Sequence, residues 1–217
     1  MFEGTGDRKL EDMVRKGTTT VSIVCKDSVV LGADTRATEG YFVASKHAKK
    51  VLKIDEHIAM TIAGVVADAQ NVVEILRVNA SLFHLENGRP IMVNAAARLT
   101  ANLLYQYRGA FLIQALMGGI DESGAHIFDI DPFGSVIEET CASTGSGSPV
   151  AYGVLEDGYL KDMIVEEGTL LVVKAVTAAM KRNIATGDSF DIVIIDEKGF
   201  HELTEEEKKE IQAKITA

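Results

Sequence analysis

Cysteine is scarce in this sequence. The chain has 217 residues but only two cysteines, Cys25 and Cys141, which lie far apart and outside any CxxC spacing. Disulfide frameworks and zinc knuckles need closely spaced cysteines. The five histidines are also scattered, and none belongs to an HExxH motif. We therefore expect neither a disulfide network nor a metal site, and no motif indicates a cofactor.

Long apolar runs are absent as well. No run approaches the roughly 18 to 20 apolar residues that a membrane-spanning helix needs. The amino terminus also lacks the apolar segment of a secretory signal. We therefore expect a cytoplasmic protein that has no membrane partner.

Positive charge is in deficit, because the formal net charge is -10 and the acidic residues are spread along the chain. Nucleic-acid-binding surfaces need clustered Lys and Arg, so we do not expect a nucleic acid partner. Residues 145–148 read GSGS, but no GxGxxG or Gly-Lys-Ser/Thr motif is completed there. A phosphate-binding loop is therefore a poor interpretation of this segment.

The residues that are present indicate a folded domain preceded by a short leader. Hydrophobic residues make up 47% and charged residues 25% of the chain, which is typical of a globular protein. Residues 1–17 are polar and show no sustained apolar period, as a flexible leader would. A strong strand pattern begins directly after them. We expect one structured domain over residues 18–217.

Alternating and β-branched residues predict several strands. The first two form a β-hairpin, and Phe42–Ala44 and Val51–Ile54 are expected to extend the same sheet. Gly118, Gly119 and Gly124 are expected to separate later strands. The predicted strands are Thr18–Val24, Val29–Ala33, Phe42–Ala44, Val51–Ile54, Phe111–Met117, His126–Ile130, Ser135–Cys141, Phe190–Ile195 and Phe200–Leu203.

Helical spacing of apolar residues alternates with these strand patterns. The first helix uses Val78 and Leu82 among its apolar positions and ends at Asn87 and Gly88, and Ser146 or Ser148 is a candidate cap for the third. The predicted helices are Ala67–Leu85, Val93–Tyr107, Pro149–Leu155, Val165–Lys181 and a charged helix from Glu205. Strands, two helices, strands, two helices and strands predict an α+β fold, a four-layer αββα sandwich.

Five motifs carry the chemical information. Gly17 is followed by three threonines at the junction between leader and strand, which alone is no more than a strand signal. The other motifs are GADTRAT at 32–38, SKHAKKV at 45–51, TIAGVVADA at 61–69 and ASTGSGSPVAYGVLE at 142–156. Together they resemble proteasome β subunits of the archaeal kind, collinearly from Gly17 to about Ile195.

The resemblance implies that the leader is a propeptide, removed by autocatalytic cleavage between Gly17 and Thr18. Thr18 then matches the catalytic nucleophile, with Asp34 and Lys50 as its catalytic partners. A threonine hydroxyl needs a base, and an α-amino group with a pKa of about 7.7 to 8.0 can accept its proton. A neighbouring lysine lowers the pKa of that amine, and an aspartate keeps the lysine charged.

The resemblance also assigns a supporting network. The backbone amide of Gly64 is expected to stabilise the oxyanion, and Ser146 to order the hydrogen bonds around the amine. The family's Arg-Asp-x-x-Ser-Gly stretch reads RNIATG at residues 182–187. Asn183 therefore replaces an aspartate and Thr186 a serine. We expect activity to survive, with a different amine pKa and rate.

By resemblance, the pocket for the side chain before the scissile bond is mostly apolar, so hydrophobic side chains are expected to be preferred. Backbone groups near Thr38 and Gly64 would hold the peptide as an added strand. The implied substrate-binding residues are Ala37, Thr38, Ala48, Leu52, Ile62, Val66 and Gln70.

The implied function is that of a threonine endopeptidase acting on unfolded polypeptides. The family confines this activity inside heptameric β rings that α subunits cap, with an unfolding ATPase as an indirect partner. One alternative is a non-catalytic structural β subunit that is never processed. A second is the related bacterial threonine protease that works without α subunits, which the leader and the STGSGSP motif disfavour.

Overall fold

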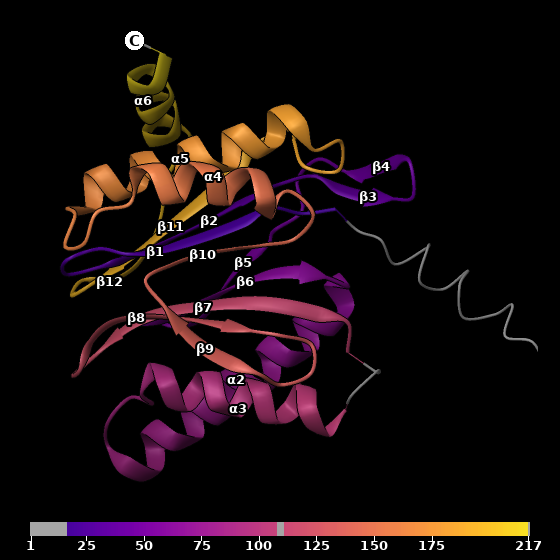
Figure 1. Cartoon of the computed structure of the whole chain (residues 1–217). Coiled ribbons are helices and arrows are strands. Elements are labelled where there is room, and N and C mark those ends of the chain that lie inside the picture. Colours follow the sequence, from indigo (N-terminus) through magenta and orange to yellow (C-terminus); the bar gives the residue numbers. More distant parts are fainter. Residues whose placement is uncertain (1–16, 108–110, 217) are drawn as a thin grey trace, which may run out of the picture.

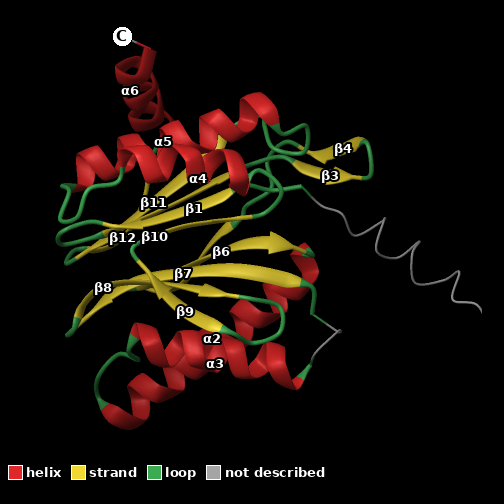
Figure 2. Cartoon of the chain, viewed as in Figure 1, coloured by secondary structure: helices red, strands yellow, loops and turns green. Residues whose placement is uncertain are grey.

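Two antiparallel sheets face each other, and helices cover the outer face of each sheet (Figure 1). The structure is a computed structural model that describes residues 17–107 and 111–216. Figure 2 shows the resulting order of layers, which is helices, sheet, sheet, helices. The predicted α+β, four-layer αββα sandwich is therefore confirmed. Residues 1–16 of the expected leader lie outside the described residues.

The first sheet contains five strands in the order β10-β1-β2-β11-β12. The central strand β2 is buried along its whole length, because its side chains alternate between the facing sheet and the covering helices. The strands are β10 (Cys141–Thr144), β1 (Thr20–Val24), β2 (Val29–Asp34), β11 (Phe190–Asp196) and β12 (Gly199–Glu202).

The second sheet also contains five strands, in the order β5-β6-β7-β8-β9. Its long central strand β7 pairs with β6 from Ile113 to Gly119 and with β8 from Ala115 to Asp121. The strands are β5 (Val51–Asp55), β6 (Ile58–Gly64), β7 (Ile113–Asp121), β8 (Gly124–Ile130) and β9 (Val136–Glu139).

The segments 42–44 and 51–54, which are predicted to extend the first sheet, do not belong to it, so that prediction is wrong. β3 (Ala37–Glu39) and β4 (Phe42–Ser45) form a separate two-stranded hairpin that projects from the sandwich (Figure 1). β5 then belongs to the second sheet. The alternation of residues identifies a strand but not its partner, because both sheets offer similar apolar faces.

The predicted strand Ser135–Cys141 is two strands. β9 ends at Glu139 in the second sheet, and β10 starts at Cys141 in the first. Gly118 and Gly119 also lie inside β7 instead of separating strands. A Cβ at Gly119 would lie 2.4 Å from the carbonyl oxygen of His57, so close approach of the neighbouring strand explains this glycine.

All five predicted helices are present, with ends shifted by a few residues. α2 ends as expected, because Gly88 adopts a left-handed conformation (φ 66°) and its N–H binds the carbonyl of His84. The helices are α2 (Val66–Asn87), α3 (Val93–Gln106), α4 (Ser148–Gly158), α5 (Val165–Arg182) and α6 (Glu205–Thr216).

Two details of the helix predictions are wrong. The residue before α4 is Gly147, which has no side chain, and Ser148 is already the first helical residue, so no serine caps this helix. Val78 and Leu82 are 55% and 50% exposed, whereas Val72, Val73 and Leu76 carry the buried face of α2. The sequence spacing placed both kinds of residue on one broad apolar stripe.

The apolar core has three layers. One lies between α2, α3 and the second sheet, one between α4, α5 and the first sheet, and one between the two sheets. Fully buried side chains such as Leu76, Met117 and Val172 each contribute about 1.5 to 3 kcal/mol. This packing fixes the strand ends near Thr20, Asp34 and Gly64, where the candidate site lies.

No helix within 17–107 and 111–216 combines the length and apolar character needed to cross a membrane. In the same ranges, no cluster of three His, Cys, Asp or Glu side chains has an arrangement that could hold a metal ion.

Candidate active site

Thr18 lies two residues before the start of β1 and is only 3% exposed. Its hydroxyl donates a hydrogen bond to the carbonyl oxygen of Gly17 at 2.7 Å. Its backbone N–H points to Oγ of Ser146 at a long 3.4 Å, and its carbonyl accepts the N–H of Gly147 at 3.3 Å. The predicted nucleophile is therefore held by the loop between β10 and α4.

Gly17 fits its position because it has no side chain. A Cβ there would lie 1.7 Å from Cβ of Ala185, which is an impossible contact. The N–H of Gly17 donates to Oγ1 of Thr38 at 3.2 Å. Both sides of the predicted cleavage point are thus fixed by residues distant in sequence.

Gly145 permits the close approach of the neighbouring loop. It has φ of 87°, and a Cβ at this position would lie 2.2 Å from the carbonyl oxygen of Thr18. Only glycine satisfies both the backbone conformation and the contact.

Asp34 ends β2 and presents a fully buried carboxylate that four donors surround. Lys50 Nζ at 2.7 Å and the N–H of Thr19 at 2.9 Å bind Oδ1. The N–H groups of Gly187 at 3.0 Å and Arg36 at 3.1 Å bind Oδ2. Burial of a charge is costly unless it is paired and hydrogen-bonded, and these contacts provide both.

Lys50 precedes β5 and is 5% exposed. Burial lowers its pKa, and the charge and hydrogen bond of Asp34 oppose this effect without cancelling it. Asp34 thus favours the charged form of Lys50, which is the expected direction, although burial is the larger effect. Because burial dominates, the neutral form of Lys50 is more accessible than that of an exposed lysine.

Gly64 ends β6 and lines the same cavity as Thr18. Its φ is 132°, and a Cβ would lie 2.1 Å from the carbonyl oxygen of Leu112. No other residue is accommodated there, and the main chain itself forms the cavity wall. This placement is compatible with an amide that contacts substrate.

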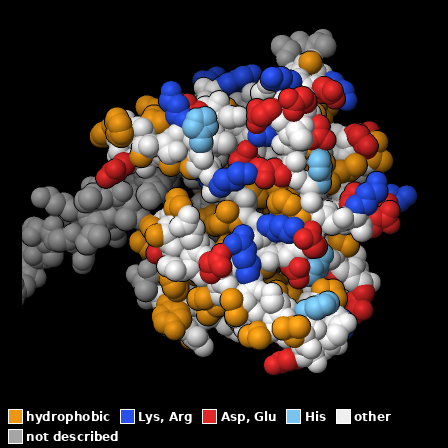
Figure 3. All heavy atoms as spheres, turned by 180° about the vertical axis from the view of Figure 1, so that it is seen from behind, with side chains coloured by type: hydrophobic (Ala, Val, Ile, Leu, Met, Phe, Trp, Pro, Cys, Tyr) orange, Lys and Arg blue, Asp and Glu red, His pale blue; other side chains and the backbone are white. Residues whose placement is uncertain are grey.

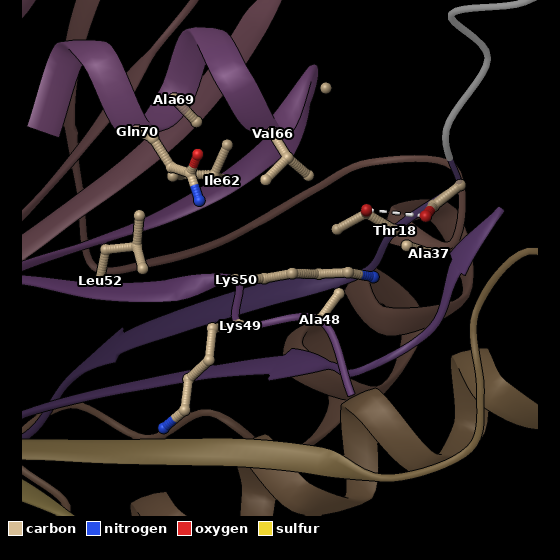
Figure 4. A pocket seen from close by; sticks show the side chains of 12 residues that line it. Thr18, Ala37, Ala48, Lys49, Lys50, Leu52, Ile62, Val66, Ala69 and Gln70 are labelled. Atoms are coloured by element: carbon tan, nitrogen blue, oxygen red, sulfur yellow. Dashed lines mark hydrogen bonds between the residues drawn. The ribbon is translucent and has the colours of Figure 1, made fainter. Parts of the chain in front are cut away.

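A cavity of about 240 Å³ opens beside Thr18. Figure 4 shows Leu52, Ile62, Val66 and Gln70 on one side and Thr18 with Ala37 on the other. Six of the seven predicted substrate-binding residues line it; Thr38 instead accepts the N–H of Gly17. The lining consists of Gly17, Thr18, Ala37, Ala48, Lys49, Lys50, Leu52, Ile62, Gly64, Val66, Ala69 and Gln70.

Sequence reasoning missed Lys49 and Ala69 in this lining. Ala69 lies three residues after Val66 and one before Gln70, so helical spacing was the signal that would have identified it. Lys49 forms an ion pair with Glu202, and Figure 4 shows its side chain pointing away from the cavity. That contact joins distant segments and has no local signal.

Thr186 and Asn183, two of the predicted supporting residues, bond to neighbours of the site and not to the hydroxyl of Thr18 itself. Thr186 shares a 2.8 Å hydrogen bond with the hydroxyl of Thr19. Asn183 caps the end of α5, and its Oδ1 accepts the N–H of Ala185 at 2.9 Å. The side chain of Asn183 therefore stabilises its own loop, which carries Thr186 and Gly187.

The comparisons with known proteins agree with this arrangement. A family model described as a proteasome subunit matches residues 14–195. Proteasome subunit beta 2 of Nitrosopumilus maritimus (strain SCM1) is 49% identical over 203 residues, which cover 93% of this chain and 97% of the relative. Proteasome subunit beta of Ferroglobus placidus is 49% identical over 208 residues, covering 95% and 99%.

A third relative, Proteasome subunit beta 1 of Korarchaeum cryptofilum, is 47% identical over 204 residues, covering 94% of this chain and 99% of the relative. Such identity over nearly the full length of each chain establishes the family of this protein. The chain belongs to the proteasome subunit family, as a 20S β subunit of the archaeal type.

Proposed function

We propose that this chain is a catalytic β subunit, a threonine endopeptidase that hydrolyses peptide bonds of unfolded proteins through Thr18. One observation carries the proposal. The hydroxyl of Thr18 lies 2.7 Å from the Gly17 carbonyl oxygen, and Thr18 lines the same apolar cavity as Lys50, which pairs with the buried Asp34. Nucleophile, charged pair and binding pocket therefore meet at one buried point.

Maturation uses the same hydroxyl. Thr18 Oγ1 attacks the carbonyl carbon of Gly17, the peptide C–N bond breaks, and an ester joins Gly17 to Oγ1 while the nitrogen becomes the amine. Water then hydrolyses the ester and releases residues 1–17 as a propeptide. The contacts of Gly17 with Thr38 and Ala185 support this step, because they restrain the scissile carbonyl beside the hydroxyl. Residues 18–217 form the mature catalytic domain.

After maturation, the α-amine of Thr18 takes the proton of its own hydroxyl. This amine has an ordinary pKa near 7.7 to 8.0, and the adjacent Lys50 favours its neutral form. Ser146, whose Oγ faces this nitrogen in the unprocessed chain, orients the amine. The proton then passes to the leaving nitrogen, and water hydrolyses the acyl-enzyme.

Substrate binding relies on the cavity and its glycine wall. The apolar lining formed by Ala37, Leu52, Ile62 and Val66 favours a hydrophobic side chain before the scissile bond. The N–H of Gly64 stabilises the oxyanion of the tetrahedral intermediate. Because the backbone near Thr38 and Gly64 holds the peptide as a strand, affinity depends little on the remaining sequence.

Membership of the proteasome subunit family implies assembly with other proteasome subunits. We propose heptameric β rings capped by α subunits, in the cytoplasm, with an unfolding ATPase that supplies substrate. Enclosure restricts an unspecific protease to polypeptides that are threaded inside. The leader then delays activity until assembly is complete.

The test is mass spectrometry of particles assembled from this chain and proteasome α subunits, after treatment with a peptide epoxyketone. We expect Thr18 as the amino terminus, carrying one inhibitor adduct. Thr18→Ala should keep the leader and take no adduct, whereas Thr18→Ser, which retains a hydroxyl, should still be processed. An intact leader in assembled wild-type particles would instead identify a non-catalytic structural subunit.

A further inference from the structure

The loop from Asn183 to Ser189 connects α5 to β11 and touches the candidate site at two points. The N–H of Gly187 donates to Oδ2 of Asp34 at 3.0 Å. The hydroxyl of Thr186 lies 2.8 Å from that of Thr19, the residue that follows the nucleophile. The position of this 183–189 loop therefore bears directly on the geometry of the site.

The guanidinium of Arg36 binds the 183–189 loop through two hydrogen bonds. Its Nε donates to Oδ2 of Asp188 at 2.7 Å, and its Nη1 donates to the carbonyl of Ile184 at 2.8 Å. Its own backbone N–H donates to Oδ2 of Asp34 at 3.1 Å. One residue thus contacts the buried carboxylate through its backbone and the loop through its guanidinium.

The loop is shaped to receive this guanidinium. A Cβ at Gly187 would lie 2.5 Å from Cζ and Nη2 of Arg36, so the guanidinium packs against the bare main chain. Asp188 has φ of 67° and is one of two non-glycine residues with positive φ in the described ranges. A left-handed conformation is less favourable for aspartate than for glycine, and Asp188 adopts it where its carboxylate accepts the hydrogen bond from Arg36.

The two charges stabilise each other. The hydrogen bond with Asp188 raises the pKa of Arg36, and the same bond holds the pKa of Asp188 below its ordinary value. The neighbouring Lys46 and His47 lower the pKa of Asp188 further. The side chains are 24% and 17% exposed, so solvent screens the pair only in part.

We propose that Arg36 and Asp188 are positioning residues for catalysis, which hold the 183–189 loop so that Gly187 fixes the carboxylate of Asp34. This inference rests on the proposed function. The two donors on Oδ2 are the N–H groups of Arg36 and Gly187. The ion pair between Arg36 and Asp188 fixes the positions of both donors. Without it the loop moves away, Oδ2 loses a donor, and the carboxylate turns relative to Lys50.

The expected effect is on turnover and not on substrate binding. Neither Arg36 nor Asp188 lines the cavity, so the pocket for the substrate side chain is unchanged. The Asp34–Lys50 bond lies beside the reacting groups, and small displacements there lower the rate strongly. A residue with a merely structural role would instead affect melting or assembly and leave the turnover of each assembled particle intact.

The experiment uses full-length chains co-assembled with proteasome α subunits and a fluorogenic peptide that ends in a hydrophobic residue. We expect Asp188→Asn and Arg36→Gln each to lower kcat about tenfold while KM changes less than twofold. The double variant should be no slower than either single variant, because one interaction is removed in all three. Arg36→Lys keeps the charge but cannot bind Asp188 and the Ile184 carbonyl at the same time, so its kcat should lie between those of the wild type and Arg36→Gln.

Controls separate the possible causes. Glu74→Gln removes an exposed carboxylate paired with Arg77 on α2 and should retain the wild-type kcat. Asp188→Gly, which relieves the backbone conformation, replaces Asp188→Asn if that variant fails to assemble. Wild-type kcat in the single variants, additive losses, or a change in KM alone would overturn the proposal. Absence of an epoxyketone adduct on wild-type Thr18 would instead overturn the proposed function.

Discussion

Gly17 shows at the scale of one residue how a leader and a nucleophile are fitted together. The residue is buried, and the space that a Cβ would need is already occupied by Ala185. Ala185 belongs to the same 183–189 loop that contacts Asp34. The loop therefore restrains both the scissile carbonyl and the carboxylate, so one substitution in it affects maturation and turnover together.

Substituting Gly17 by alanine tests this fit. We predict that Gly17→Ala slows removal of the leader at least tenfold, because the added methyl displaces the carbonyl or the loop. Mass spectrometry of the amino terminus over time after assembly measures the effect. Gly4→Ala is the matched control in the leader and should be processed at the wild-type rate. Equal rates for both variants would mean that the contact with Ala185 does not restrain the scissile bond.

The sequence alone identifies some residues of the site and misses others, for a physical reason. Thr18, Asp34 and Lys50 belong to local motifs, and their roles remain predictions, although the structure brings them together. Arg36 lies inside one of these motifs, but its partner Asp188 is 152 residues away. A contact between distant segments leaves no periodic pattern in one sequence, so neither the ion pair nor Ala185 was predictable.

At the scale of elements, helices were predicted better than strand partners. α3 and α5 bury one clear face, and their apolar period alone locates them. β5 and β10 were assigned to the wrong sheet or merged with a neighbour, because period-two alternation is the same in either sheet. Local patterns determine what a segment becomes, whereas the packing of both sheets determines where it pairs.

α6 offers an element-scale prediction, because a buried ion pair attaches it to the first sheet. Lys208 Nζ binds Asp191 at 3.0 Å and Glu205 at 2.9 Å, and Lys208 is 7% exposed. We predict that Lys208→Met destabilises the chain by about 3 kcal/mol, because Asp191 remains buried without its cation. Thermal melting measures this loss, and Lys209→Met, an exposed neighbour, is the control.

The pH dependence of that pair follows from the pKa of Lys208. Burial lowers this pKa, but the bonds with Glu205 and Asp191 outweigh burial, and the net pKa is raised. The stabilisation is therefore complete below the unfolded pKa of about 10.4 and disappears as the pH rises through the folded value. The difference in melting temperature between wild type and Lys208→Met should be constant near neutrality and shrink in strong alkali. A constant difference there would contradict this assignment.

At the scale of the whole molecule, α2 presents an outer face that is more apolar than a solvent-facing helix requires. Val78, Leu82 and Leu85 are 55%, 50% and 79% exposed, and Ile75 is 37% exposed. Apolar side chains gather in the lower part of Figure 3, which the α2–α3 layer forms. Exposed apolar patches of this kind indicate interaction surfaces. Membership of the proteasome family implies subunits that could cover this face.

The matching prediction concerns assembly and not folding. Val78→Asp combined with Leu82→Asp should lower the melting temperature of the isolated chain by less than about 3 °C, since exposed substitutions rarely cost more than 0.5 kcal/mol. The same change should reduce assembled particles at least tenfold, because two charges lose water when the face is covered. Ser81→Asp is the control, as it adds charge to an exposed position on α2 without removing apolar area. Gel filtration of co-expressed subunits measures assembly, and normal particle yield from the double variant would show that this face stays in solvent.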